Sequence, residues 1–96
     1  MPATLEMRPP QLVGSRQQAR SLFEELIHNL HGSIVILNCS RLEVATPSFM
    51  DEVIRVVLVE SLASKLVLES PTRRIADYAE RSATLRKVSD RLSIRS

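Results

Sequence analysis

Apolar and polar positions along the chain follow two periodicities, which divide it into strands and helices. The segment Ser33–Cys39 contains a solid apolar run of the kind found in a strand covered on both faces, so we expect a central strand there. A shorter run predicts another strand at Lys65–Glu69. A weak alternation at Thr4–Arg8 predicts either a short edge strand or an ordered arm, and Pro9 and Pro10 allow no further ladder donation because proline has no backbone N–H.

The first helix is predicted to begin at Ser15. Ser15 and Gln18 match a capping box, in which the hydroxyl accepts one backbone N–H and the amide reaches back to another. Apolar residues then follow helical spacing as far as Leu30, and Gly32 supplies the left-handed residue that commonly ends a helix. The expected buried stripe consists of Ala19, Leu22, Phe23, Leu26, Ile27 and Leu30.

A polar passage separates the central strand from the second helix. Leu42 and Val44 flank Glu43 in a short alternation that either extends the strand or lines a loop. The helix start has two interpretations, which the sequence leaves open. In one, Thr46 is the N-cap and Pro47 the first helical residue; in the other, Ser48 is the N-cap and Asp51 completes the box.

The second helix, over residues 49–62, is the most hydrophobic in the chain. Its run Val56–Val59 taken alone suggests a strand. We favour a helix because apolar spacing continues from Phe49 and because Asp51 and Arg55 are placed to pair at i, i+4. Its apolar residues exceed one stripe, so it is either buried on most sides or shows an apolar side to a partner or to a second copy, as in a homodimer.

The last helix is expected over Arg73–Leu92, after a cap-like Ser70-Pro71 step. The order is then strand, helix, strand, helix, strand, helix. This βαβαβα order predicts an α/β fold: one domain over residues 1–96, with a small, mainly parallel sheet and helices packed on it.

Composition adds that the core must be aliphatic, since 44% of the 96 residues are hydrophobic but only 3% are aromatic. The single cysteine, Cys39, lies inside the strand run, where a buried thiol is expected. There is no charged leader before an apolar block and no apolar stretch of membrane-spanning length, so the expected location is cytoplasmic, with no membrane partner.

Charge is unevenly distributed: residues 1–70 carry a formal −2 and residues 71–96 carry +4. An alternative function is therefore that of a small basic domain that binds nucleic acid through its C-terminal helix. Acidic residues interleave with the basic ones and aromatic residues are few, which favours a solvated helix face instead. The basic set is Arg73, Arg74, Arg81, Arg86, Lys87, Arg91 and Arg95.

Candidate chemistry is sparse. No Gly-rich phosphate loop or Gly-x-Ser-x-Gly elbow is present, so we expect no enzyme and no cofactor. His28 and His31 stand one turn apart, but two ligands do not close a metal site. Asp51 and Glu52 diverge by about 100° on a helix and are expected to occupy an exposed first turn.

Two short segments resemble the STAS-like domain family, which is related to bacterial anti-sigma-factor antagonists. That family's signature runs as valine-leucine-Asp-Phe-Ser, a variable step, and Pro-Ser-Phe-x-Asp-Glu. The corresponding segments here are Ile36-Leu37-Asn38-Cys39-Ser40 and Pro47-Ser48-Phe49-Met50-Asp51-Glu52.

The resemblance implies a non-enzymatic binding module in a partner switch with a GHKL-type ATPase or kinase that acts as an anti-sigma factor. In true antagonists a hydroxyl before the second helix is phosphorylated. Pro47 stands in that place here, so Ser48 and Thr46 are the candidate phosphoacceptors, with simple helix capping as the alternative role. The expected partner-binding residues are Leu42, Val44, Thr46, Pro47, Ser48, Phe49 and Asp51.

Overall fold

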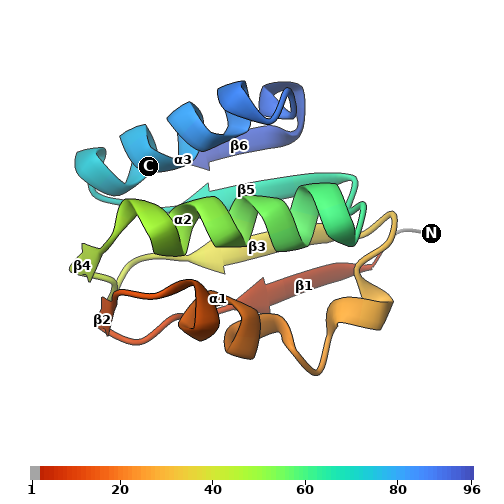
Figure 1. Ribbon diagram of the computed structural model, residues 1–96, viewed down its shortest axis with the longest axis horizontal. Coiled ribbons are helices and arrows are strands. Elements are labelled where there is room, and N and C mark those ends of the chain that lie inside the picture. Colours follow the sequence, from red (N-terminus) through yellow and green to blue (C-terminus); the bar gives the residue numbers. More distant parts are fainter. Residues whose placement is uncertain (1–2) are drawn as a thin grey trace.

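Four parallel strands form the sheet of the computed structural model, which describes residues 3–96. They are β1 (Thr4–Met7), β3 (Ile34–Asn38), β5 (Lys65–Glu69) and β6 (Leu92–Arg95). Their order in the sheet, β1-β3-β5-β6, follows the chain, so each strand is added beside the one before it (Figure 1). Ile34 of the central strand pairs with Thr4 on one side and with Lys65 on the other.

Three helices pack on this sheet: α1 (Arg16–Phe23), α2 (Pro47–Ile54) and α3 (Arg73–Leu85). α2 lies between α1 and α3 and contacts both, so the helices form one layer on one face of the sheet (Figure 1). The predicted α/β class with a parallel sheet is confirmed.

The core is aliphatic and centres on the second helical segment. α2 continues without a break into the π-helix η2 (Arg55–Glu60), so the Val56–Val59 run is helical as predicted. Val59 and Leu62, at the end of the predicted segment, are 41% and 51% exposed, whereas the apolar side chains from Phe49 to Leu58 are buried. The sheet meets them with Val35, Leu37, Leu66 and Leu68, all fully buried. Burial on most sides is confirmed, and contact of the remaining apolar residues with a partner or a second copy stays a prediction.

Two predicted helices are too long. α1 ends at Phe23, and the chain continues through turns and the 3-10 helix η1 (Ile27–Asn29), whose i→i+3 bonds wind more tightly than an α-helix. α3 ends at Leu85, and Lys87 adopts a left-handed φ of 61° that turns the chain back toward the sheet. The expected helix to Leu92 is therefore wrong: Leu92 starts the fourth strand, beside Leu66.

A second, very small sheet joins the segments that lead into α1 and α2. β2 (Leu12–Val13) and β4 (Val44–Ala45) pair in parallel, with Leu12 beside Val44. The alternation around Glu43 thus belongs to a separate ladder and does not extend the central strand. This ladder lies where the main strands end, and it fixes the position of the loop before α2 (Figure 1).

Candidate contact site at the start of α2

Thr46 is the N-cap of α2, and Pro47 is its first helical residue, so the first of the two cap interpretations is confirmed. The Thr46 hydroxyl accepts a hydrogen bond from the Phe49 backbone N–H at 3.1 Å. It also donates one to the Gly14 carbonyl at 3.0 Å. The hydroxyl therefore both caps α2 and ties it to the loop before α1.

The remaining residues predicted to bind a partner divide into exposed and buried ones. Val44 is 55% exposed, and Pro47 and Ser48 are also exposed. Leu42 and Phe49 are buried, with exposures of 2% and 0%, and belong to the core. Val44, Pro47 and Ser48 are therefore accessible from solvent, whereas Leu42 and Phe49 are not.

Asp51, one turn into α2, is held by both neighbouring helices. Arg86 donates to its two carboxylate oxygens at 2.9 and 2.8 Å, and Ser82 donates to Oδ1 at 2.6 Å. Arg16 of α1 donates to Oδ2 at 2.6 Å. These bonds, led by that of Arg86, hold the pKa of Asp51 well below its ordinary value although burial opposes the shift.

Glu52 is the most deeply buried charged side chain of the site, at 1% exposure. Arg55 donates to both of its oxygens, at 3.0 and 2.7 Å, while Arg20 reaches Oε2 at 3.0 Å and Arg16 reaches Oε1 at 3.3 Å. The Arg55 bonds in particular lower the pKa of Glu52 from 4.5 to about 2, against the effect of burial. Glu60, at the end of η2, extends the network to Arg20 and Arg55.

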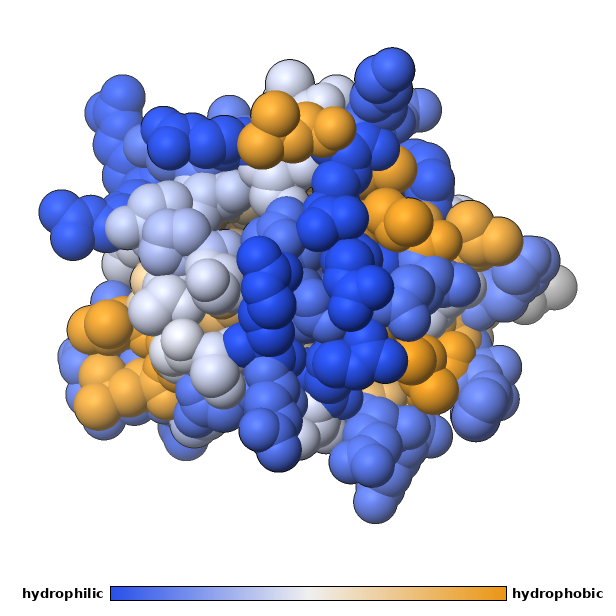
Figure 2. Space-filling view, in the orientation of Figure 1, coloured by the Kyte–Doolittle hydropathy of each residue, from blue (hydrophilic) through white to orange (hydrophobic). Residues whose placement is uncertain are grey.

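The two acids therefore do not form an exposed first turn, and that expectation is wrong. Arg55 pairs with Glu52 and Glu60 and not, as expected, with Asp51 at i, i+4. Together the acids join α1, α2 and α3, and we call this set of ion pairs the interhelical network. A band of hydrophilic side chains crosses the helical layer in Figure 2.

A hollow of about 200 Å³ opens between α2 and α3, and we call it the α2–α3 groove. The first turns of α2 contribute Pro47, Ser48 and Asp51, and Arg16 of α1 reaches its rim. The wall from α3 is formed by Tyr78, Arg81, Ser82 and Leu85. The sequence did not predict this wall: the i, i+3, i+4, i+7 spacing places its residues on one face of α3 but does not show that this face borders α2.

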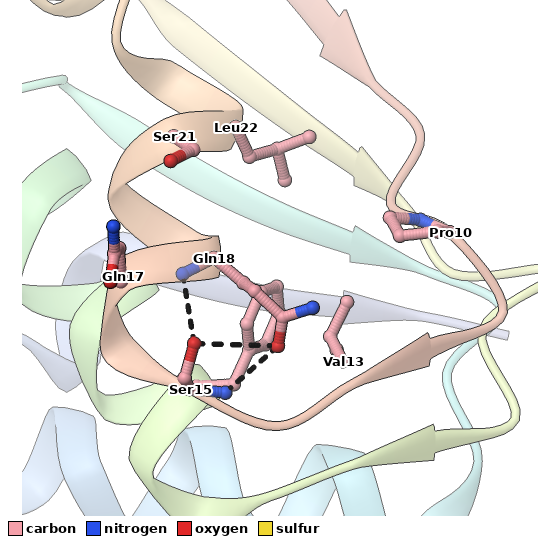
Figure 3. Close-up of a pocket in the computed structure, with 8 residues that line it drawn as sticks. Pro10, Val13, Ser15, Gln17, Gln18, Ser21 and Leu22 are labelled. Atoms are coloured by element: carbon pink, nitrogen blue, oxygen red, sulfur yellow. Dashed lines mark hydrogen bonds between the residues drawn. The ribbon is translucent and has the colours of Figure 1, made fainter.

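A larger hollow, of about 460 Å³, lies beside α1 (Figure 3). Its lining residues are all uncharged, and Ser15 and Gln18 stand at one end of it. The predicted capping box is confirmed, because the Ser15 hydroxyl accepts from the Gln18 N–H and the Gln18 side chain accepts from the Ser15 N–H. These polar groups are occupied in starting α1.

Three residues of the basic C-terminal set are bonded to other parts of the protein. Arg86 is held by Asp51, Arg91 donates to the carbonyls of Leu58 and Ala63, and Arg95 pairs with Glu69 at 3.5 Å. These residues stabilise helix ends and the edge of the sheet. Arg73, Arg74, Arg81 and Lys87 are exposed.

The cysteine and the two histidines, the remaining candidates from the sequence, do not form a site with other metal-binding side chains of residues 3–96. Cys39 is buried as predicted, and burial raises the pKa of its thiol to about 12. His28 and His31 are exposed, and no cluster of three or more metal-binding side chains occurs within residues 3–96. No helix in this described part of the chain combines the length and apolar character needed to cross a bilayer.

No protein family, curated protein or solved structure gives a significant match to this chain.

Proposed function

We propose that this chain is a non-enzymatic protein-binding module of a bacterial regulatory switch, with a GHKL-type ATPase or kinase as its partner. The observation that carries the proposal is the exposure of Pro47 and Ser48 at the start of α2. They open the segment that resembles the STAS-like signature. They also lie beyond the carboxyl ends of the parallel strands, where open α/β sheets commonly place their sites.

Ser48 is the hydroxyl through which we propose that binding is regulated. The Thr46 hydroxyl is occupied by two hydrogen bonds, whereas Ser48 is exposed to an approaching kinase. A phosphate would add about −1.5 to −2 charges at the positive end of α2 and change what can dock there. Because Ser48 would face the bound partner, the added charge would promote dissociation of the complex.

The test is association with a purified GHKL-type ATPase from the same cell, measured by calorimetry. We expect Ser48→Asp to weaken association roughly tenfold, a loss of about 1.4 kcal/mol of binding free energy caused by the added charge. Ser48→Ala should leave the affinity within about twofold. Ser89→Asp is the matched control, since Ser89 is exposed in the 3-10 helix η3 (Ser89–Arg91), before β6. Equal effects of Ser48→Asp and Ser89→Asp would refute the assigned surface.

Phosphorylation has its own measurement. After incubation with the candidate kinase and ATP, mass spectrometry should find the phosphate on the peptide that contains Ser48. The Ser48→Ala variant should remain unmodified. A phosphate on neither Ser48 nor Thr46 would rule out this form of regulation.

A further inference from the structure

The α2–α3 groove has an apolar interior at the protein surface. Pro47 lies on one side, and Tyr78 and Leu85 lie on the other. Leu85 is 76% exposed, the largest exposure among the large apolar residues of the described chain. Apolar groups gathered around one hollow mark a contact site more strongly than scattered ones do. At about 200 Å³, the hollow is smaller than the roughly 300–1,000 Å³ of small-molecule sites, and its size suits one inserted side chain.

The charges around the groove favour an acidic occupant. Asp51 contributes the one carboxylate of the lining, and Arg86 already pairs with both of its oxygens. Arg16 bonds to acids through Nη1 alone, and its side chain is 51% exposed. The side chain of Arg81 is exposed, and within residues 3–96 its guanidinium group makes no hydrogen bond or ion pair. Two guanidinium groups therefore have donors left for carboxylates.

We propose that the α2–α3 groove binds an acidic peptide segment of a partner protein, with one apolar side chain in the hollow and flanking carboxylates on Arg81 and Arg16. The segment would run along the α3 wall, where Tyr78, Arg81 and Leu85 follow one another on one helix face. This inference rests on the proposed function in one respect: both assume that a protein binds at the start of α2.

The probe is a fluorescein-labelled twelve-residue peptide with a single leucine between two blocks of glutamate and aspartate. Binding is followed by fluorescence anisotropy and by amide chemical shifts of the 96-residue protein, up to about 1 mM peptide, the weak end of measurable affinity. We expect shifts to concentrate at Ser48, Tyr78, Arg81 and Leu85. Replacing the leucine by alanine should weaken binding, and replacing the acids by lysines should abolish it.

Two variants probe the two halves of the groove. Leu85→Ala removes the apolar wall and Arg81→Glu reverses the charge, and each should weaken peptide binding roughly fivefold or more. The matched controls are Val59→Ala and Arg73→Glu, which change exposed residues outside the groove lining and should stay within about twofold. Amide spectra of the free variants verify that each remains folded.

Several results would overturn the proposal. One is that the lysine peptide binds as tightly as the acidic peptide. Another is that groove amides show no chemical-shift change up to about 1 mM peptide. A third is that the groove variants and the control variants lose the same affinity for the peptide. Shifts of groove amides that depend on protein concentration without peptide would assign the groove to a second copy instead. If the peptide fails while Ser48→Asp still releases the ATPase, only the groove assignment falls and the proposed function stands.

Discussion

Pro47 and Ser48 face solvent at the start of α2, whereas Asp51 and Glu52, one turn later, are fixed within the interhelical network. These four residues belong to one short segment and follow one another on one helix. The first pair is available to a partner, and the second pair sets the positions of α1 and α3 around α2. One short segment therefore combines exposed residues, which we propose for partner contact, with residues that hold the three helices together, and mutations should separate the two roles.

Of the mutations in this segment, Glu52→Ala is expected to cause the largest loss of folding stability. This change removes the buried carboxylate that Arg20 and Arg55 share, and we expect it to lower the free energy of unfolding by about 2 kcal/mol, because charge-assisted hydrogen bonds are lost while the two partly exposed arginines keep Glu60. Urea denaturation followed by circular dichroism measures it, with an unchanged slope showing that the unfolded state is the same. Glu60→Ala is the matched control, because Glu60 contacts the same arginines from a more exposed position and should cost much less.

Low pH should weaken the ion pairs of Asp51 and Glu52 without any mutation. The folded-state pKa of Glu52 lies at about 2, below its ordinary 4.5, so its contribution is complete above about pH 5 and is lost as pH falls toward 2. The lowered pKa of Asp51 acts in the same direction. Urea denaturation between pH 7 and pH 2 should therefore show stability falling in acid, and the fall should be shallower in Glu52→Gln. Identical pH profiles for the two proteins would contradict this assignment.

The smallest effects distinguish the two hydroxyls at the start of α2. Thr46→Ala removes both the cap and the bond to the Gly14 carbonyl, and should cost about 1 kcal/mol of stability. Ser48→Ala should change stability by no more than about 0.5 kcal/mol, because Ser48 is exposed. The same denaturation experiment measures both. Equal losses would mean that Ser48 also has a structural role.

The first three strands of the main sheet and the helix starts were predictable because their signals are local. The Ile34–Leu37 run, the Ser15 capping box and the Thr46-Pro47 step each depend on a few neighbouring residues, and the structure has all three. The end of α3 was not predicted, because its amphipathic pattern continues past Leu85. Only the pairing of Leu92 with Leu66, far away in sequence, makes a strand there.

The interhelical network was unpredictable for a similar reason. In sequence, Asp51 and Glu52 look like solvated residues of a helix start, and no local signal links them to Arg16, Arg20 or Arg86. Their burial follows from the packing of α1 and α3 on either side of α2. The same packing creates the α2–α3 groove, so the wall formed by Tyr78 and Leu85 also could not be located from its own segment alone.

The order of the strands has a consequence for how the domain folds. Successive strands of the main sheet pair at separations of about 30 residues along the chain, and within residues 3–96 the first strand, β1, does not pair with the last, β6. Every step of sheet growth therefore closes a loop of similar, moderate length. We expect folding at the pace of mixed α/β domains, by addition of successive strand–helix units onto the β1–β3 or β3–β5 pair.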